Sequence, residues 1–333
     1  MLGRDHTGEE VLDNDLDQDE AAPDELPATR EGEALGGWLF DLPPPVRLDA
    51  EVVVKAPLLP VWTSSKARLI SRYIYFFEMI TKHGTYIDGF AGPQSPETQD
   101  SWAAEMVLDL KPLWLRHFHL CDNRRAQVRA LKTLKGRHPQ LDVRVYEGDF
   151  NDSVNLILQP GVLLKEATFC LLDQRTFECN WETLDKLARF KTDVESETKI
   201  ELFYFLAQAW LDRAFSGLRD TGKRQAEEWW GRPDWRQLAT MTAWERALAF
   251  TERFKHDLGY KSVKPWGIYA SDEETGARGR LMYHMIHATD HLEAPKQMAR
   301  AYSAATKGPS RGRQLLLMDE ESSSLDEGRG RRR

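Results

Sequence analysis

The sequence predicts an α/β protein with a doubly wound, mostly parallel sheet of seven strands and a helical insertion after the fifth strand. Apolar runs typical of buried strands alternate with segments of helical periodicity. The first three runs each lead into a carboxylate, at Asp88, Asp122 and Asp149. The last two, 266–270 and 281–287, are joined by a polar loop and predict a hairpin with one antiparallel strand.

Each element follows from local patterning. Ser64 or Ser65 can cap a helix that stops near Gly84, and a strand at 85–88 follows. We expect further helices at 102–115, 123–136, 181–188 and 294–305, and further strands at 116–122, 143–146, 167–173 and 200–205. The alternation of these elements is the basis of the fold prediction.

Length and composition favour a protein with a large buried core. The chain has 333 residues, of which 41% are hydrophobic. No apolar run approaches the ~20 residues that cross a bilayer, and no secretory signal is visible. We therefore expect a soluble, cytoplasmic protein that does not bind membranes.

Charge is distributed unevenly along the chain. The net charge is −8, and the acidic residues are concentrated in the first 35 positions. We expect a disordered acidic arm over 1–45, a single α/β domain over 46–306 and a disordered tail over 307–333. A solvated arm is favoured over a DNA-mimicking one.

The turn after the first strand predicts a nucleoside cofactor. The segment from Thr85 to Pro93 is an apolar run that ends in Asp88 and breaks into a Gly-rich turn. Such a turn exposes backbone N–H groups and lets a ligand approach closely. The cofactor's polar tail would lie near Asp88, its ribose near Asp122 and its adenine amine near Asp149.

These three acids are expected to line one hollow, because parallel strands present their carboxyl ends at the same edge of a sheet. The alternative is that turns favour Asp for local reasons. At the end of the fourth strand, Asp173, Gln174 and Arg175 are candidates for substrate handling, and a capped turn is the alternative.

The region 208–258 reads as helical and could cap a substrate. Aromatic side chains interleaved with arginines suit stacked bases and phosphates, although tryptophans at helical spacing more often pack in a core. The core interpretation is favoured. The tryptophans in question are Trp210, Trp229, Trp230, Trp235 and Trp244.

Neither the cysteines nor the histidines predict a metal site. Cys121, Cys170 and Cys179 form no close pair, and burial as reduced thiols is expected. His284 and His287 would point to opposite faces of a strand, so no bound zinc is predicted near them and His291.

Three segments carry a resemblance to a known family. Asp88-Gly-Phe-Ala-Gly-Pro93, the stretch from Leu172 to Leu184 and the stretch from Tyr283 to His291 resemble the three-Cys-motif partner protein (TcmP) family over about residues 62–305. The family's name refers to a cysteine motif in its partner. The resemblance implies a class I methyltransferase-like domain, a phage or mobile-element context, and association with a radical-SAM-like protein of the phage Gp37/Gp68 type.

The resemblance also implies S-adenosylmethionine as cofactor and a methyltransferase whose acceptor the sequence does not identify. The methionine tail would lie against Asp88, Gly89, Phe90, Ala91 and Gly92, the ribose against Asp122, and the adenine against Asp149 and Phe150. Asp173 would accept a proton or hydrogen bond. The alternatives are a non-catalytic partner protein and a protein that binds or modifies nucleic acid.

Two departures from the methyltransferase pattern bear on catalysis. Gln94 stands where the turn usually carries its second glycine. Asp173-Gln-Arg-Thr176 replaces the Asp-Pro-Pro-aromatic element of amino-methyltransferases, which removes the best signature of adenine or cytosine N-methylation.

Overall fold

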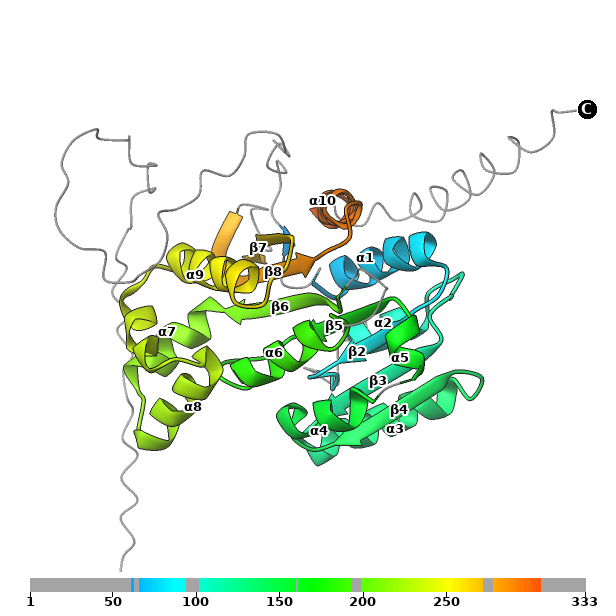
Figure 1. Cartoon of the computed structure of the whole chain (residues 1–333), viewed down its shortest axis with the longest axis horizontal. Helices are drawn as coiled ribbons and strands as arrows, with labels where there is room; N and C mark the ends of the chain where they lie inside the picture. Colours follow the sequence, from blue (N-terminus) through cyan, green and yellow to red (C-terminus); the bar gives the residue numbers. More distant parts are fainter. Residues whose placement is uncertain are drawn as a thin grey trace, which may run out of the picture. The chain divides into compact units, whose positions relative to one another are not determined.

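The computed structural model describes residues 61–62, 66–93, 102–159, 161–192, 199–271 and 278–306. Within them the strands form an eight-stranded sheet with helices on both faces (Figure 1). The expected arm at 1–45 and tail at 307–333 lie outside the described residues, as do Ser64, Ser65 and Gln94.

The sheet has the predicted doubly wound arrangement, with strand order β1-β7-β8-β6-β5-β2-β3-β4. All neighbouring strands are parallel except β8, which runs antiparallel to β6 and β7. The strands are β1 (Val61–Trp62), β2 (Thr85–Asp88), β3 (His117–Asp122), β4 (Asp142–Glu147), β5 (Thr168–Leu172), β6 (Glu201–Ala207), β7 (Ser262–Ser271) and β8 (Arg278–Thr289). All seven predicted strands are present, and the two-residue β1 is an addition at the edge.

The helices are α1 (Lys66–Thr81), α2 (Ala103–Leu108), α3 (Arg125–Arg137), α4 (Phe150–Ile157), α5 (Val162–Lys165), α6 (Trp181–Arg189), α7 (Gln208–Ser216), α8 (Asp220–Trp230), the 3-10 helix η3 (Pro233–Thr240), α9 (Ala243–His256) and α10 (Ala294–Thr306). The predicted helix at 102–115 is shortened to α2. Pro112 explains this, since a proline in a helix clashes with the carbonyl four residues earlier, here that of Leu108. The short helices α4 and α5 were not predicted.

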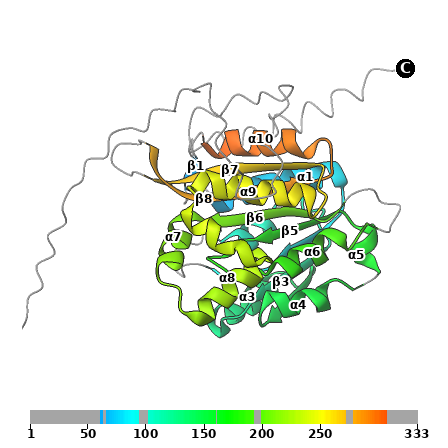
Figure 2. The same ribbon diagram turned by 60° about the vertical axis from the view of Figure 1, so that its left-hand side comes forward.

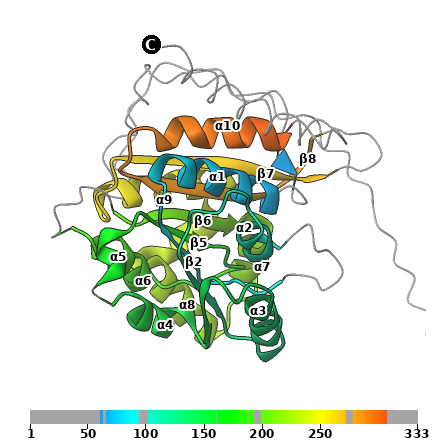
Figure 3. The ribbon, with the colours of Figure 1, turned by 90° about the vertical axis from the view of Figure 1, so that its right-hand side faces the viewer.

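The core has two layers, one on each face of the sheet. On one face α1 packs against α10 (Figure 3), and the rings of Tyr73, Phe169 and Phe203 meet above the central strands. On the other face α6 and the helices of the insertion cover the sheet (Figure 2). Strands β2, β5 and β6 are buried along their whole length, as expected for central parallel strands.

The three cysteines are buried and free, as predicted. No helix among residues that the structure describes is long and apolar enough to span a membrane.

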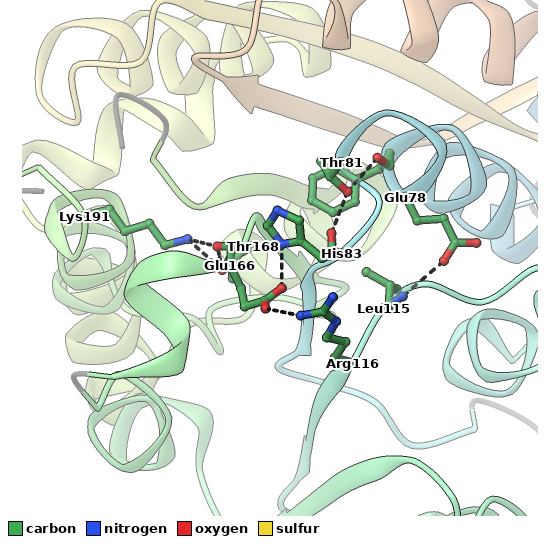
Figure 4. Close-up of polar contacts among 9 residues, drawn as sticks. Glu78, Thr81, His83, Leu115, Arg116, Glu166, Thr168 and Lys191 are labelled. Carbon is green, nitrogen blue, oxygen red and sulfur yellow. Dashed lines mark hydrogen bonds and ion pairs between the residues drawn. The ribbon is translucent and has the colours of Figure 1, made fainter. Parts of the chain in front are cut away.

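Polar side chains tie the amino edge of the sheet to α1 and to the segment before β5 (Figure 4). A carboxylate oxygen of Glu166 lies 2.6 Å from Nδ1 of His83, and the other lies 3.4 Å from the Arg116 guanidinium. Buried Lys191 donates to the hydroxyl of Thr168 at 2.8 Å. The carboxylate of Glu78 accepts a backbone N–H bond from Trp114 at 2.9 Å. These contacts fix the end of the sheet that is remote from the predicted ligand site.

Candidate functional site

A cavity of about 370 Å³ lies at the carboxyl edge, over the ends of β2, β3, β4 and β5. Here β2 pairs with β3 on one side and β5 on the other, so the strand order reverses. Open α/β sheets bind ligands at such a reversal, and the volume is within the range of small-molecule sites. Of the residues predicted to bind cofactor, the lining includes Gly89, Phe90, Asp149 and Phe150.

Gly89 and Phe150 are pressed together beneath this cavity. A Cβ atom on Gly89 would lie 2.9 Å from the Phe150 ring and 3.1 Å from Leu172, so a side chain does not fit. The Phe90 ring packs against Phe150 with centroids 6.0 Å apart. The turn after β2 and the start of α4 therefore supply an apolar surface beside polar groups.

Asp149 caps helix α4. Its Oδ1 accepts bonds from the backbone N–H and the side-chain amide of Asn151, both at 2.8 Å. Its Oδ2 has no hydrogen-bond partner within the described ranges, and the side chain is exposed. One acceptor oxygen of a carboxylate in the cavity lining therefore remains available to a ligand donor.

Asn151 joins two loops around the cavity and was not predicted from the sequence. Its side-chain amide donates to the carbonyl of Glu178 at 2.8 Å, and its side-chain oxygen accepts from the backbone of Asn180 at 2.9 Å and from the Thr183 hydroxyl at 2.7 Å. The sequence shows only an amide side chain shortly after Asp149. It does not indicate the role of Asn151, because the partners of Asn151 lie about 30 residues further along the chain.

The backbone N–H groups of the Gly-rich turn are all bonded within the protein. Gly89 donates to the Leu171 carbonyl at 3.0 Å and Ala91 to that of Cys121 at 2.8 Å. Phe90 donates to the Asp88 carboxylate and Gly92 to that of Asp122, both at 3.1 Å. The expectation that this turn offers N–H groups to a cofactor is therefore not met, because two strand carbonyls and two carboxylates have taken them.

Asp122 is buried beneath that turn. Besides the Gly92 N–H, its carboxylate accepts the backbone N–H of Arg124 at 2.8 Å and contacts the Arg124 guanidinium at 3.3 Å. A Cβ atom on Gly92 would lie 2.4 Å from its Oδ2. Asp122 is absent from the lining of the 370 Å³ cavity, so the three acids share an edge of the sheet but not one hollow. Its ribose role stays a prediction.

Asp88 is also buried, at the end of β2. It accepts a hydrogen bond from the Tyr86 hydroxyl at 3.0 Å, and burial raises the pKa of its carboxyl to about 7. It lines a separate pocket of about 20 Å³ together with Ala91, Gly92, Trp102, Lys66 and Asp173. Phe90 lines both this pocket and the larger cavity.

Asp173 forms a buried ion pair with Lys66. The ammonium Nζ lies 2.7 and 2.9 Å from the two carboxylate oxygens and also faces the rings of Phe205 and Tyr283, at 5.1 and 4.7 Å from their centroids. Sequence reasoning missed Lys66 because it stands 107 positions earlier, in the first turn of an apolar helix. Lys66 therefore balances the charge of the Asp173 carboxylate, which the sequence predicted to act on substrate.

Gln174 and Arg175 lie in the loop after β5 and differ in what they do. The side-chain oxygen of Gln174 accepts the backbone N–H bonds of Glu178 and Cys179, at 3.2 and 3.0 Å, so it shapes the loop. Arg175 donates its backbone N–H to the Glu178 carboxylate at 2.6 Å, and its side chain is exposed. A role of either residue in substrate handling stays a prediction.

The cavity lining is acidic. It includes the carboxylates of Asp149, Glu178 and Glu228, of which Glu228 pairs with Arg224 at 2.8 Å, and no lysine or arginine is among its lining residues. Such a lining favours ligands with positive charge or with hydroxyl and amine donors, and it repels phosphate. No group of three or more His, Cys, Asp or Glu side chains in the part of the chain that is described could hold a metal ion.

The helical insertion forms one wall of the cavity, through Gln225 and Glu228 of α8. Trp229, Trp230 and Trp235 are buried, as the core interpretation predicted. Trp210 and Trp244, by contrast, are 44% and 52% exposed.

The histidines of β8 do lie on opposite faces. His284 contacts the side-chain amide of Gln208 at 3.0 Å, and burial lowers its pKa to about 4. His287 contacts the carboxylate of Glu201 at 2.8 Å, on the side of Tyr73.

Comparison with known proteins gives distant structural similarity. No protein-family model matches the chain, and no curated protein matches its sequence. A SAM-dependent methyltransferase from Agrobacterium tumefaciens is similar over 67% of this chain and 61% of its own, at 9% identity and a TM-score of 0.37. This chain thus spans less than two thirds of that protein.

Two further structures show similarity at the same level. A protein of the family DUF519 from Legionella pneumophila covers 76% of this chain and 94% of its own, at 9% identity and a TM-score of 0.40. An S-adenosylmethionine-dependent methyltransferase from Clostridium acetobutylicum is similar over 71% of this chain and 79% of its own, at 10% identity and a TM-score of 0.28. The fold assignment rests on the strand order alone.

Proposed function

We propose that this chain binds S-adenosylmethionine, with the adenosine part in the 370 Å³ cavity, and that it is a methyltransferase-like protein of the TcmP type. The observation that carries the proposal is the cavity's position at the reversal of strand order. The resemblance in sequence supports the choice of cofactor.

The lining fits the adenosine part better than the methionine tail. Phe90 and Phe150 offer apolar surface to a base, and Oδ2 of Asp149 can accept a bond from an exocyclic amine. The acidic lining suits a cofactor that carries a sulfonium charge. The N–H groups of the Gly-rich turn, however, are already bonded within the protein.

When bound, this cofactor would supply an electrophilic methyl group. The chain's own contribution would be orientation of the two reactants and exclusion of water, which is most of what such a transfer requires. Asp173, held by Lys66, would accept a hydrogen bond from the molecule that receives the methyl group, near the end of β5.

A second candidate function is non-catalytic. The chain would keep the fold and the ligand site and would associate with a radical-SAM-like protein. Two observations favour it. The carboxylate of Asp173 is neutralised by Lys66, and the side-chain oxygen of Gln174 is used within its own loop.

Isothermal titration of the chain with S-adenosylmethionine tests binding. Asp149→Ser keeps a good helix cap and removes the ligand-facing acceptor, so we expect at least about 10-fold weaker binding. Asp152→Ser, an equal charge change in the same helix but outside the cavity lining, should leave the affinity unchanged. Equal loss in both variants, or no binding by the parent chain, would reject the site. Transfer of labelled methyl to cell extracts then separates enzyme from partner.

A further inference from the structure

Two exposed tryptophans are the most conspicuous surface feature of the insertion. Trp210 belongs to α7 and Trp244 to the first turn of α9. Their neighbours Trp229, Trp230 and Trp235 are almost completely buried, so exposure of these two is not a general property of the segment. The Trp244 ring lies against His284, with centroids 5.6 Å apart, and the starts of α7 and α9 are joined because Gln208 donates to the carbonyl of Ala243.

Three exposed arginines of this region, Arg175, Arg213 and Arg236, have no carboxylate partner within the described residues, and Arg213 lies on the exposed ring of Trp210. The guanidinium of Arg213 lies 4.9 Å from the Trp210 ring centre, and that of Arg236 lies 4.7 Å from the ring of Trp235. Among residues that the structure describes, neither forms an ion pair, and the side chain of Arg175 forms none either. Six other basic residues of the insertion are paired with acids, namely Lys223, Arg224, Arg232, Arg246, Arg253 and Lys255, whereas exposed Arg219 has no ion pair among the described residues.

Packing links this surface to the cavity. Phe177 lines the cavity and contacts Phe215 of α7 with ring centroids 5.3 Å apart. Phe215 in turn stacks on Trp235, the residue before Arg236. Helix α7, which carries Trp210 and Arg213, therefore contacts the cavity lining near its last turn, and Arg175 precedes Phe177 by two residues in the same loop.

We propose that Trp210 and Trp244, with Arg175, Arg213 and Arg236, form a binding surface for single-stranded nucleic acid, which would be the methyl acceptor. Unpaired bases stack on exposed indoles, and unpaired guanidinium groups bind phosphates. The acidic cavity keeps phosphates out, so the backbone stays on the arginine side while a base can reach inward. Because it names the acceptor, this surface rests on the proposed function.

Fluorescence anisotropy with a labelled single strand of about 16 nucleotides, as RNA and as DNA, measures this binding at about 50 mM and 200 mM salt. Trp210→Ala, at an exposed position, should weaken binding at least about 5-fold. Arg213→Gln combined with Arg236→Gln should lower the slope of log affinity against log salt by about 1.4. The control is Lys186→Gln combined with Lys223→Gln, which removes the same charge from lysines that are already paired. It should change neither the affinity nor the slope against salt.

Absence of binding to both strands at low salt would overturn the proposal, as would unchanged binding by the Trp210 and arginine variants. Equal affinity for a duplex, insensitive to Trp210→Ala, would also overturn it, because paired bases cannot stack on the indole. Titration of the same variants with S-adenosylmethionine reports on the cavity independently. If the chain binds the oligonucleotide but not the cofactor, the proposed surface is supported and the proposed function is rejected. If it binds the cofactor but not the oligonucleotide, only the proposed surface is rejected.

Discussion

Lys66 and Asp173 form an ion pair whose partners are 107 positions apart in the chain, with side chains that are 7% and 13% exposed. The pair joins the first turn of α1 to the end of β5, beside Asp88. Asp173, one of the three residues that the sequence singled out for catalysis, is therefore also an anchor between two distant segments.

Lys66→Met should destabilise the chain by about 3 kcal/mol, because it removes the ammonium that balances the mostly buried Asp173 carboxylate. Urea unfolding measures this. Adding Asp173→Leu should recover much of the loss, since an apolar pair of similar size removes the uncompensated charge. A loss below about 1 kcal/mol for Lys66→Met would show that the pair behaves like a surface ion pair.

Glu78 should make stability depend on pH. Burial raises the pKa of its carboxyl from 4.5 to about 7. Between these values the folded chain holds a proton that the unfolded chain releases, so the stabilisation is full below pH 4.5 and is lost as pH rises to 7.

Glu78→Gln removes this titration and can keep the bond to the Trp114 N–H. The stability of the variant relative to the parent should therefore rise between pH 5 and pH 8, by on the order of 2 kcal/mol. Glu182→Gln, at an exposed ion pair, is the control and should show no such trend. A flat difference for Glu78→Gln would contradict the assigned pKa. Chemical denaturation at several pH values measures both.

Gly92→Ala should be strongly destabilising, since the added Cβ would lie 2.3 Å from Cβ of Gln127 and 2.4 Å from the Asp122 carboxylate. We expect a loss of about 2 kcal/mol or more. Gly136→Ala is the matched control, because nothing lies within 4 Å of its Cβ and alanine favours the helix. It should stabilise by about 0.5 kcal/mol. Similar effects of the two changes would mean that the turn is not packed on Asp122.

Asn151→Ala should loosen the cavity by removing the bonds that hold Glu178, Asn180 and Thr183. A loss of about 2 kcal/mol is expected, together with weaker ligand binding. Asn155→Ala, in the same helix but with one exposed bond, should cost less than about 0.5 kcal/mol. Hydrogen exchange of residues 174–180 would locate the effect. Unchanged exchange there would contradict the role given to Asn151.

The sequence predicted the sheet well because its signals are local. Each strand is a short apolar run, and the order of strands and helices dictates the doubly wound arrangement through right-handed crossovers. The edge on which Asp88, Asp122 and Asp149 lie followed from the same rule. The two-residue β1 and the short α4 and α5 carry too few residues to produce a periodic signal.

The site was predicted less completely because its contacts are long-range. A turn of small residues indicates that backbone N–H groups are accessible, but it does not show that Asp88 and Asp122 accept two of them. Lys66 and Asn151 were missed because no local pattern announces their partners. Exposure of Trp210 among buried tryptophans likewise depends on tertiary packing.

A crystal structure of the chain with S-adenosylmethionine tests the central claim most directly. The account predicts the adenine beside Phe90 and Phe150, with its amine within hydrogen-bond distance of Oδ2 of Asp149. Electron density for the cofactor at any other place on the chain, or an empty cavity at saturating cofactor, would contradict it.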